Sequence, residues 1–186
     1  MHAFSRRRFL AAASAPVALA ACGNGIGSDG SARIDARVDS ALQFMYGTVP
    51  GTRALGEKAS GILMMPLVTE AGVGIGGAFG RGALRVGDVT VDYYSITNAS
   101  IGLQIGAQQY SHALFFMTQP ALRSFRTSTG WVAGADLEYV VSATSGGALT
   151  TDTTTLLTPV VAVVFGQAGL IAGATIEGQK YTRIIP

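Results

Sequence analysis

From residue 61 to the C-terminus, hydrophobic and polar positions follow the two-residue period of β-strands. Ile101, Leu103 and Ile105 alternate with glycine and glutamine, which would place the three apolar side chains on one face of a sheet. The run 113–117 is continuously apolar. Strands are therefore expected at 61–66, 72–86, 101–106, 113–117, 132–143, 159–165, 170–176 and 181–185.

Three segments have the period of a helix. In 32–46, the apolar residues recur every three or four positions and would form one face. A shorter helix is expected at 52–59, after Pro50 and Gly51. A third is expected at 120–128, where Thr118 precedes the first turn. The face of the first helix consists of Ile34, Val38, Leu42 and Met45.

These elements predict an α+β fold. Its main part would be a predominantly antiparallel β-sheet, curved or barrel-like, with an N-terminal helix and one or two short flanking helices. Glycines inside the expected strands are typical of bulges, bends or close backbone contacts. The segment 158–176 has no charged residue and could be read as a membrane-spanning helix. Its β-branched residues and the central glycines of 166–169 favour two strands around a tight turn.

The N-terminal 21 residues have the pattern of an export signal. Arg6, Arg7 and Arg8 precede an apolar run at 9–20, which is too short for a stable membrane span. The arginines, with Ser5, Phe9 and Leu10, match the twin-arginine export pattern. The alternative is an ordinary secretion signal. Arg6 and Arg7 are the residues expected to carry the twin-arginine signal.

The segment 19–22, Leu-Ala-Ala-Cys, resembles the lipobox of bacterial lipoproteins. That resemblance implies acylation of Cys22, the only cysteine, and cleavage directly before it. The expected organisation is a signal peptide at 1–21, a flexible tether at 22–31 and one domain at 32–186. The protein would be anchored by lipid in the cell envelope, at the outer membrane, and would face the periplasm.

Removal of the signal changes the charge of the chain. Three of the 13 basic residues lie in the signal, which leaves ten basic residues against 11 acidic ones. This balance does not indicate nucleic-acid binding, which needs a clustered basic surface. His112 would be the single histidine of the mature chain, so a metal site or a histidine-based triad is not expected. A half-buried structural role is expected for His112.

No other motif indicates catalysis or a cofactor. Gly72, Gly74 and Gly77 have dinucleotide-binding spacing, but Gly80 and Gly82 follow where a helix would have to begin. Asp136 and Glu138 share a strand face and could bind a cation, but a solvated strand face is the favoured interpretation. The protein is therefore interpreted as non-enzymatic and without cofactor or metal, with a hydrolase lacking histidine as the weakest alternative.

Four ordered motifs make 59–186 similar to the SYLF domain, a lipid-binding module that is associated with actin in yeast. The motifs lie at 59–63, 71–84, 102–108 and 169–178, and the third reads Gly-x-Gln-x-Gly-x-Gln. Eukaryotic members have tryptophan and proline where this chain has Tyr-Tyr-Ser-Ile at 93–96, so the chain looks like the bacterial lipoprotein branch.

The resemblance implies binding of a phospholipid membrane. The alternative is a structural or protein-interaction lipoprotein with envelope proteins as partners, and actin is a partner only by family association. Eukaryotic members engage lipid through a basic N-terminal helix, whereas here Arg33 and Arg37 are balanced by Asp35 and Asp39. The cations expected at lipid lie elsewhere, near apolar residues of the third helix and the last strand: Arg123, Arg126, Lys180 and Arg183.

Overall fold

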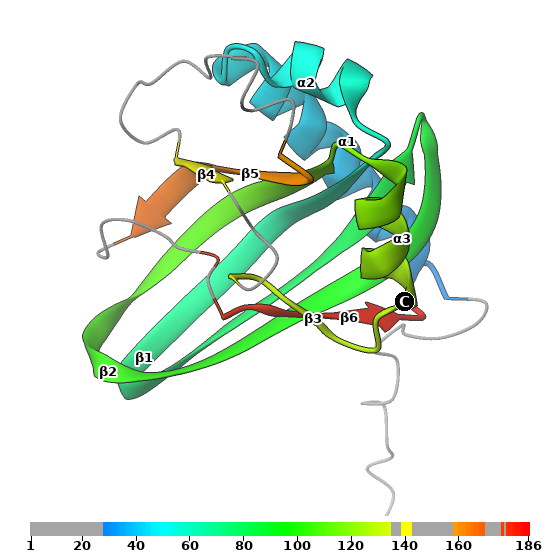
Figure 1. Ribbon diagram of the computed structural model, residues 1–186. Helices are drawn as coiled ribbons and strands as arrows, with labels where there is room; N and C mark the ends of the chain where they lie inside the picture. Colours follow the sequence, from blue (N-terminus) through cyan, green and yellow to red (C-terminus); the bar gives the residue numbers. More distant parts are fainter. Residues whose placement is uncertain (1–27, 135–138, 143–157, 170–175, 177) are drawn as a thin grey trace, which may run out of the picture.

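The computed structural model describes residues 28–134, 139–142, 158–169, 176 and 178–186. Within these ranges the chain forms three helices and six strands (Figure 1). In chain order they are α1 (Gly30–Thr48), α2 (Thr52–Lys58), β1 (Gly61–Val86), β2 (Val89–Phe116), α3 (Gln119–Thr127), β3 (Trp131–Val132), β4 (Tyr139–Ser142), β5 (Val160–Gly169) and β6 (Lys180–Ile184).

Strand β2 organises the sheet. It pairs with β1 along one edge, and its other edge pairs first with β6 at 93–97 and then with β5 at 108–116. Strand β3 extends the sheet beyond β6, and β4 extends it beyond β5. All these pairs are antiparallel except β4 with β5. The expected α+β class with a curved, mainly antiparallel sheet is confirmed.

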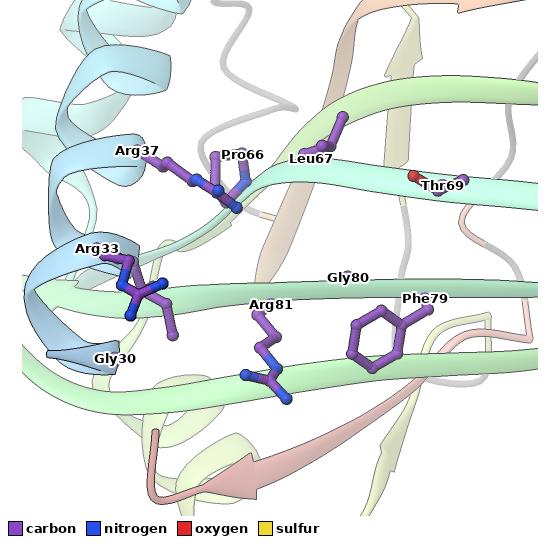
Figure 2. Close-up of a pocket in the computed structure, with 10 residues that line it drawn as sticks. Gly30, Arg33, Arg37, Pro66, Leu67, Thr69, Phe79, Gly80 and Arg81 are labelled. Carbon is purple, nitrogen blue, oxygen red and sulfur yellow. The ribbon is translucent and has the colours of Figure 1, made fainter. Parts of the chain in front are cut away.

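The long strands bend, and β1 folds back along itself. A straight strand of 26 residues would extend about 85 Å, and β1 is interrupted by register shifts at Met65/Val68 and Val73/Ile75. Its second half then passes directly against its first half (Figure 2). A β-carbon on Gly82 would lie 2.0 Å from the carbonyl oxygen of Met64. Glycine is required here because backbone occupies the place of a side chain.

Each face of the curled sheet packs its own core. On the inner face, Phe125 of α3 contacts the rings of Tyr94 and Phe116 at 4.7 Å between centroids, and that of Trp131 at 5.5 Å. On the outer face, α1 covers alternate residues of the same strands, such as Phe115. Thr118 caps α3, since its hydroxyl oxygen accepts a hydrogen bond from the backbone N–H of Ala121.

The three expected helices are confirmed, with no end shifted by more than two residues. The expected strands at 61–66 and 72–86 are one continuous strand, as are those at 101–106 and 113–117. The expected tight turn at 166–169 is wrong, because β5 continues to Gly169, which pairs with Gln108 of β2. The strand expected at 170–176 lies outside the described residues, apart from Ile176. No helix in the described ranges is long and apolar enough to cross a membrane.

A buried polar network lies inside the curl of the sheet. The Tyr181 hydroxyl lies 2.8 Å from Nε2 of His112 and 3.3 Å from Oε1 of Gln179, and Gln179 also donates to the hydroxyl of Tyr110. His112 is fully buried, so the expectation of half burial is wrong. Burial lowers the pKa of His112 to about 3, and the imidazole is neutral at neutral pH.

Acid should therefore destabilise the fold through His112. An unfolded chain protonates this histidine near pH 6.5, whereas the folded chain does not until about pH 3, so its contribution to stability is lost as the pH falls through this window. Between pH 7 and pH 5 the loss should be about 2 kcal/mol. Urea denaturation at pH 7 and pH 5 measures this loss in the free energy of unfolding. The loss should be smaller in His112→Gln than in the wild type, because glutamine does not titrate. An equal loss in both proteins would contradict this assignment.

The contact within β1 predicts a contrast between two glycines. Gly82→Ala should destabilise the fold by about 3 kcal/mol, because the new methyl group meets the Met64 carbonyl. The matched control is Gly47→Ala in α1, where a β-carbon meets nothing within 4 Å, and which should stabilise by about 0.5–1 kcal/mol. Denaturation midpoints measure both. Equal midpoints for the two variants would refute the close approach.

Candidate functional site

The charged residues of α1 point to two different places. Its acids face the end of the β1–β2 hairpin. Asp35 accepts hydrogen bonds from Thr90 at 2.7 Å and from the Tyr93 hydroxyl at 2.8 Å. Asp39 accepts from Arg85 at 2.6 Å. Burial, followed by the interaction with Asp35, raises the pKa of Tyr93 and keeps this hydroxyl a donor. The acids of α1 are thus used to attach the helix to the sheet.

The arginines of α1 lie on another side and line a pocket with β1. Arg33 and Arg37 extend from α1 toward β1, and Arg81 extends from the second half of β1 (Figure 2). The pocket has a volume of about 430 Å³. We call Arg33, Arg37 and Arg81 the arginine cluster. The remaining lining consists of Gly30, Ile34, Pro66, Leu67, Thr69, Phe79 and Gly80.

The members of the arginine cluster differ in their surroundings. Arg33 forms an exposed ion pair with Asp29, and this hydrogen bond lowers the pKa of Asp29. The guanidinium carbon of Arg81 lies 5.7 Å from the centre of the Phe79 ring. Arg37 is exposed and forms no ion pair with any residue in the described ranges. Arg37 is therefore available to a negatively charged ligand.

Exposed apolar side chains adjoin the arginine cluster. Phe79 is 52% exposed and Leu67 is 42% exposed, and both line the pocket. Guanidinium groups bind phosphate oxygens through paired N–H donors. Apolar side chains beside cations are typical of surfaces that contact lipid. The arrangement suits a ligand with a negatively charged group and an apolar part, and binding rather than bond cleavage is the chemistry that it supports.

Two of the four cations predicted from sequence, Arg126 and Arg183, come together at a different place. Arg126 of α3 donates to Asp92 at 2.8 Å, and Arg183 of β6 donates to the other oxygen of Asp92 at 3.2 Å. Arg126 and Arg183 therefore share one carboxylate partner. Arg123 and Lys180 are exposed. Lipid contact at these four residues stays a prediction.

Other predicted residues cannot be placed. Arg6, Arg7 and Cys22 lie outside the described residues, as do Asp136 and Glu138. Within the described ranges, no group of three histidine, cysteine, aspartate or glutamate residues could hold a metal ion.

The spacing of charges in α1 could have indicated the arginine cluster. Adding up the charges of the helix hides this spacing. Residues two apart on a helix are separated by about 200°, so Arg33 and Arg37 cannot share a face with Asp35 and Asp39. The charges of this helix sum to zero, but its arginines and its aspartates lie on different faces. Arg81 could not be found this way, because its position beside α1 depends on the fold of β1.

Comparison with known proteins finds a family match for part of the chain. The family model described as Ysc84, Las17-binding protein actin regulator, matches residues 97–183. This segment runs from the middle of β2 into β6. It contains none of the residues that line the arginine pocket. No curated protein matches the chain.

Proposed function

The chain contains a Ysc84 (SYLF) domain, and from this premise we propose that it binds anionic phospholipid at the membrane to which its own N-terminus is anchored. The family is associated with lipid binding and with actin regulation. The observation that carries the proposal is the arginine cluster beside exposed Phe79 and Leu67. It combines the two chemistries that a phospholipid surface needs.

Charge alone gives a useful affinity. A cation close to an anionic bilayer contributes about 1 kcal/mol, and Asp29 already offsets the charge of Arg33, so the cluster contributes about 2 kcal/mol at low salt. That corresponds to roughly thirtyfold in the dissociation constant. Because the pocket is open to solvent, salt screens this attraction.

The anchor explains why a modest affinity is sufficient. Acylation of Cys22 would keep the domain at the bilayer, with residues 23–29 as the connection to α1. Tethering converts lipid binding into an intramolecular step at high effective concentration. We place the protein in the cell envelope, at the periplasmic face of the outer membrane, with export through the signal that contains Arg6 and Arg7.

A protein partner is the second candidate, and the family description favours it. That description names a Las17-binding actin regulator. The matched segment 97–183 excludes the arginine pocket, so a partner of that kind would use a different surface. For an exported protein, an envelope protein would be the partner.

Charge removal tests the lipid site. We use the mature chain 22–186 with Cys22→Ser, which retains every described residue but carries no acyl group. Arg33→Gln, Arg37→Gln and Arg81→Gln together should weaken co-sedimentation with phosphatidylglycerol vesicles roughly thirtyfold at low salt. The melting temperature should stay unchanged, because none of the three is buried.

The control for this experiment removes the same charge elsewhere. Arg123→Gln with Lys180→Gln and Arg183→Gln should change vesicle binding by less than about threefold, since Arg183 is already paired with Asp92. If this control loses binding and the first variant does not, the contact runs through α3 and β6. If neither variant loses binding, a protein partner becomes the favoured function.

The anchor has its own test. Cells that express the wild-type chain should incorporate labelled fatty acid into it, and Cys22→Ala should abolish the label, because the chain has no other cysteine. The wild type should fractionate with membranes. A wild-type chain without label would refute the lipoprotein assignment but not the binding site.

A further inference from the structure

An apolar groove continues from the arginine pocket along α1. It has a volume of about 560 Å³ and shares Arg37, Pro66 and Leu67 with the pocket. One wall is α1, and the other is the outer face of the sheet. The residues of the groove beyond the shared three are Ala36, Ser40, Ala41, Phe44, Ser111 and Phe165.

Local structure keeps this groove open and apolar. Small residues of α1 face it, so the helix does not fill it. Pro66 and Leu67 lie in the register shift of β1, outside the paired residues, and Leu67 is turned partly to solvent. The Ser111 hydroxyl donates to the Pro66 carbonyl at 2.7 Å, which satisfies both polar groups within the groove.

Phe44 forms the far end of the groove. Its ring stacks on that of Phe165, with 6.2 Å between centroids and 28° between planes. The side chain of Phe44 is nevertheless 53% exposed. From the arginine cluster to Phe44, the surface changes from cationic to apolar along one helix face. Such a gradient matches a molecule with a charged head and a hydrocarbon tail.

We infer that the groove holds one acyl chain of a single phospholipid whose phosphate is bound by the arginine cluster. This inference rests on the proposed function and specifies its ligand. The acyl chain of the lipid would lie along α1, against Leu67 and Phe44. The headgroup would lie between α1 and β1 (Figure 2). The domain thereby binds an individual lipid partly withdrawn from the bilayer, rather than only resting on its surface.

The position of the anchor is compatible with this arrangement. Eight peptide units join Cys22 to Gly30, and they extend at most about 29 Å. Gly30 itself lines the arginine pocket. An acylated Cys22 therefore holds the headgroup end of the site within reach of the membrane, where the supply of phospholipid lies.

Two soluble probes separate headgroup binding from chain binding. Dihexanoyl phosphatidylglycerol below its micelle concentration carries both parts, and glycerophosphoglycerol carries only the headgroup. Isothermal titration of the mature Cys22→Ser chain should show at least about tenfold tighter binding of the dihexanoyl lipid, with a negative heat-capacity change. The arginine triple variant should lose both ligands.

A bulky residue in the groove provides the decisive variant. Ser40 is exposed and lines the groove, so Ser40→Trp should fill the space without disturbing the core. The affinity of this variant for the dihexanoyl lipid should fall to its affinity for glycerophosphoglycerol. Its affinity for glycerophosphoglycerol should equal that of the wild type. Gln43→Trp adds the same side chain at an exposed position of α1 that lines neither site, and should bind as the wild type does. If Ser40→Trp lowers the melting temperature, Ala36→Trp replaces it.

The outcomes distinguish the groove from the proposed function. If both probes bind equally and Ser40→Trp changes neither affinity, the groove holds no acyl chain, but headgroup binding stands. If vesicles bind and neither probe does, the contact is with the bilayer surface and the inference fails. If neither vesicles nor probes bind, both the inference and the proposed function fail. A change of oligomeric state in Ser40→Trp would assign the groove to a second copy of the chain and overturn the inference.

Discussion

The contact of β1 with itself is the constraint on which the rest of the structure depends. The Met64 and Leu67 carbonyl oxygens would lie 2.0 and 2.9 Å from β-carbons at Gly82 and Gly80, so at these two glycines the backbones of the two halves are in close contact. This contact curls the sheet and creates one enclosed face, which α3 and Trp131 cover, and one outer face for α1. Arg81 lies between the two glycines and extends from β1 into the pocket beside α1 (Figure 2).

Given that sheet, charge decides how α1 is rotated upon it. Packing of Ile34, Val38 and Met45 supplies most of the attraction, because burial of apolar surface has no preferred direction and is large. The bonds from Asp35 and Asp39 to the hairpin are partly exposed, so each stabilises the fold only modestly. Their effect is orientation: they hold the acids at one end of the hairpin and leave Arg33 and Arg37 to face β1.

Local features of the fold were predictable from sequence, and distant contacts were not. The three helices follow from apolar spacing and from the Thr118 cap, which are properties of neighbouring residues. Glycines within 72–86 indicated close backbone contact, but not that the partner is the first half of the same strand. The glycines at 166–169 suggested a turn, whereas β5 passes through a register shift at Gly166 and pairs with β2 again at Ala168 and Gly169. Arg126 meets Asp92 from 34 positions away, a distance over which charge patterns carry no information.

The division of the chain into core and site explains how one fold could serve different ligands. The matched segment 97–183 supplies most of β2, together with β5 and much of β6, and these elements contribute many of the side chains of the enclosed core. The residues of the arginine pocket all come earlier, from α1 and β1, and Arg33, Arg37 and Phe79 among them are exposed. Substitutions of these exposed residues change the charge and shape of the site without entering the enclosed core, so they cost little stability. Selection for a ligand can therefore act on α1 and β1 while the packing that curls the sheet is retained.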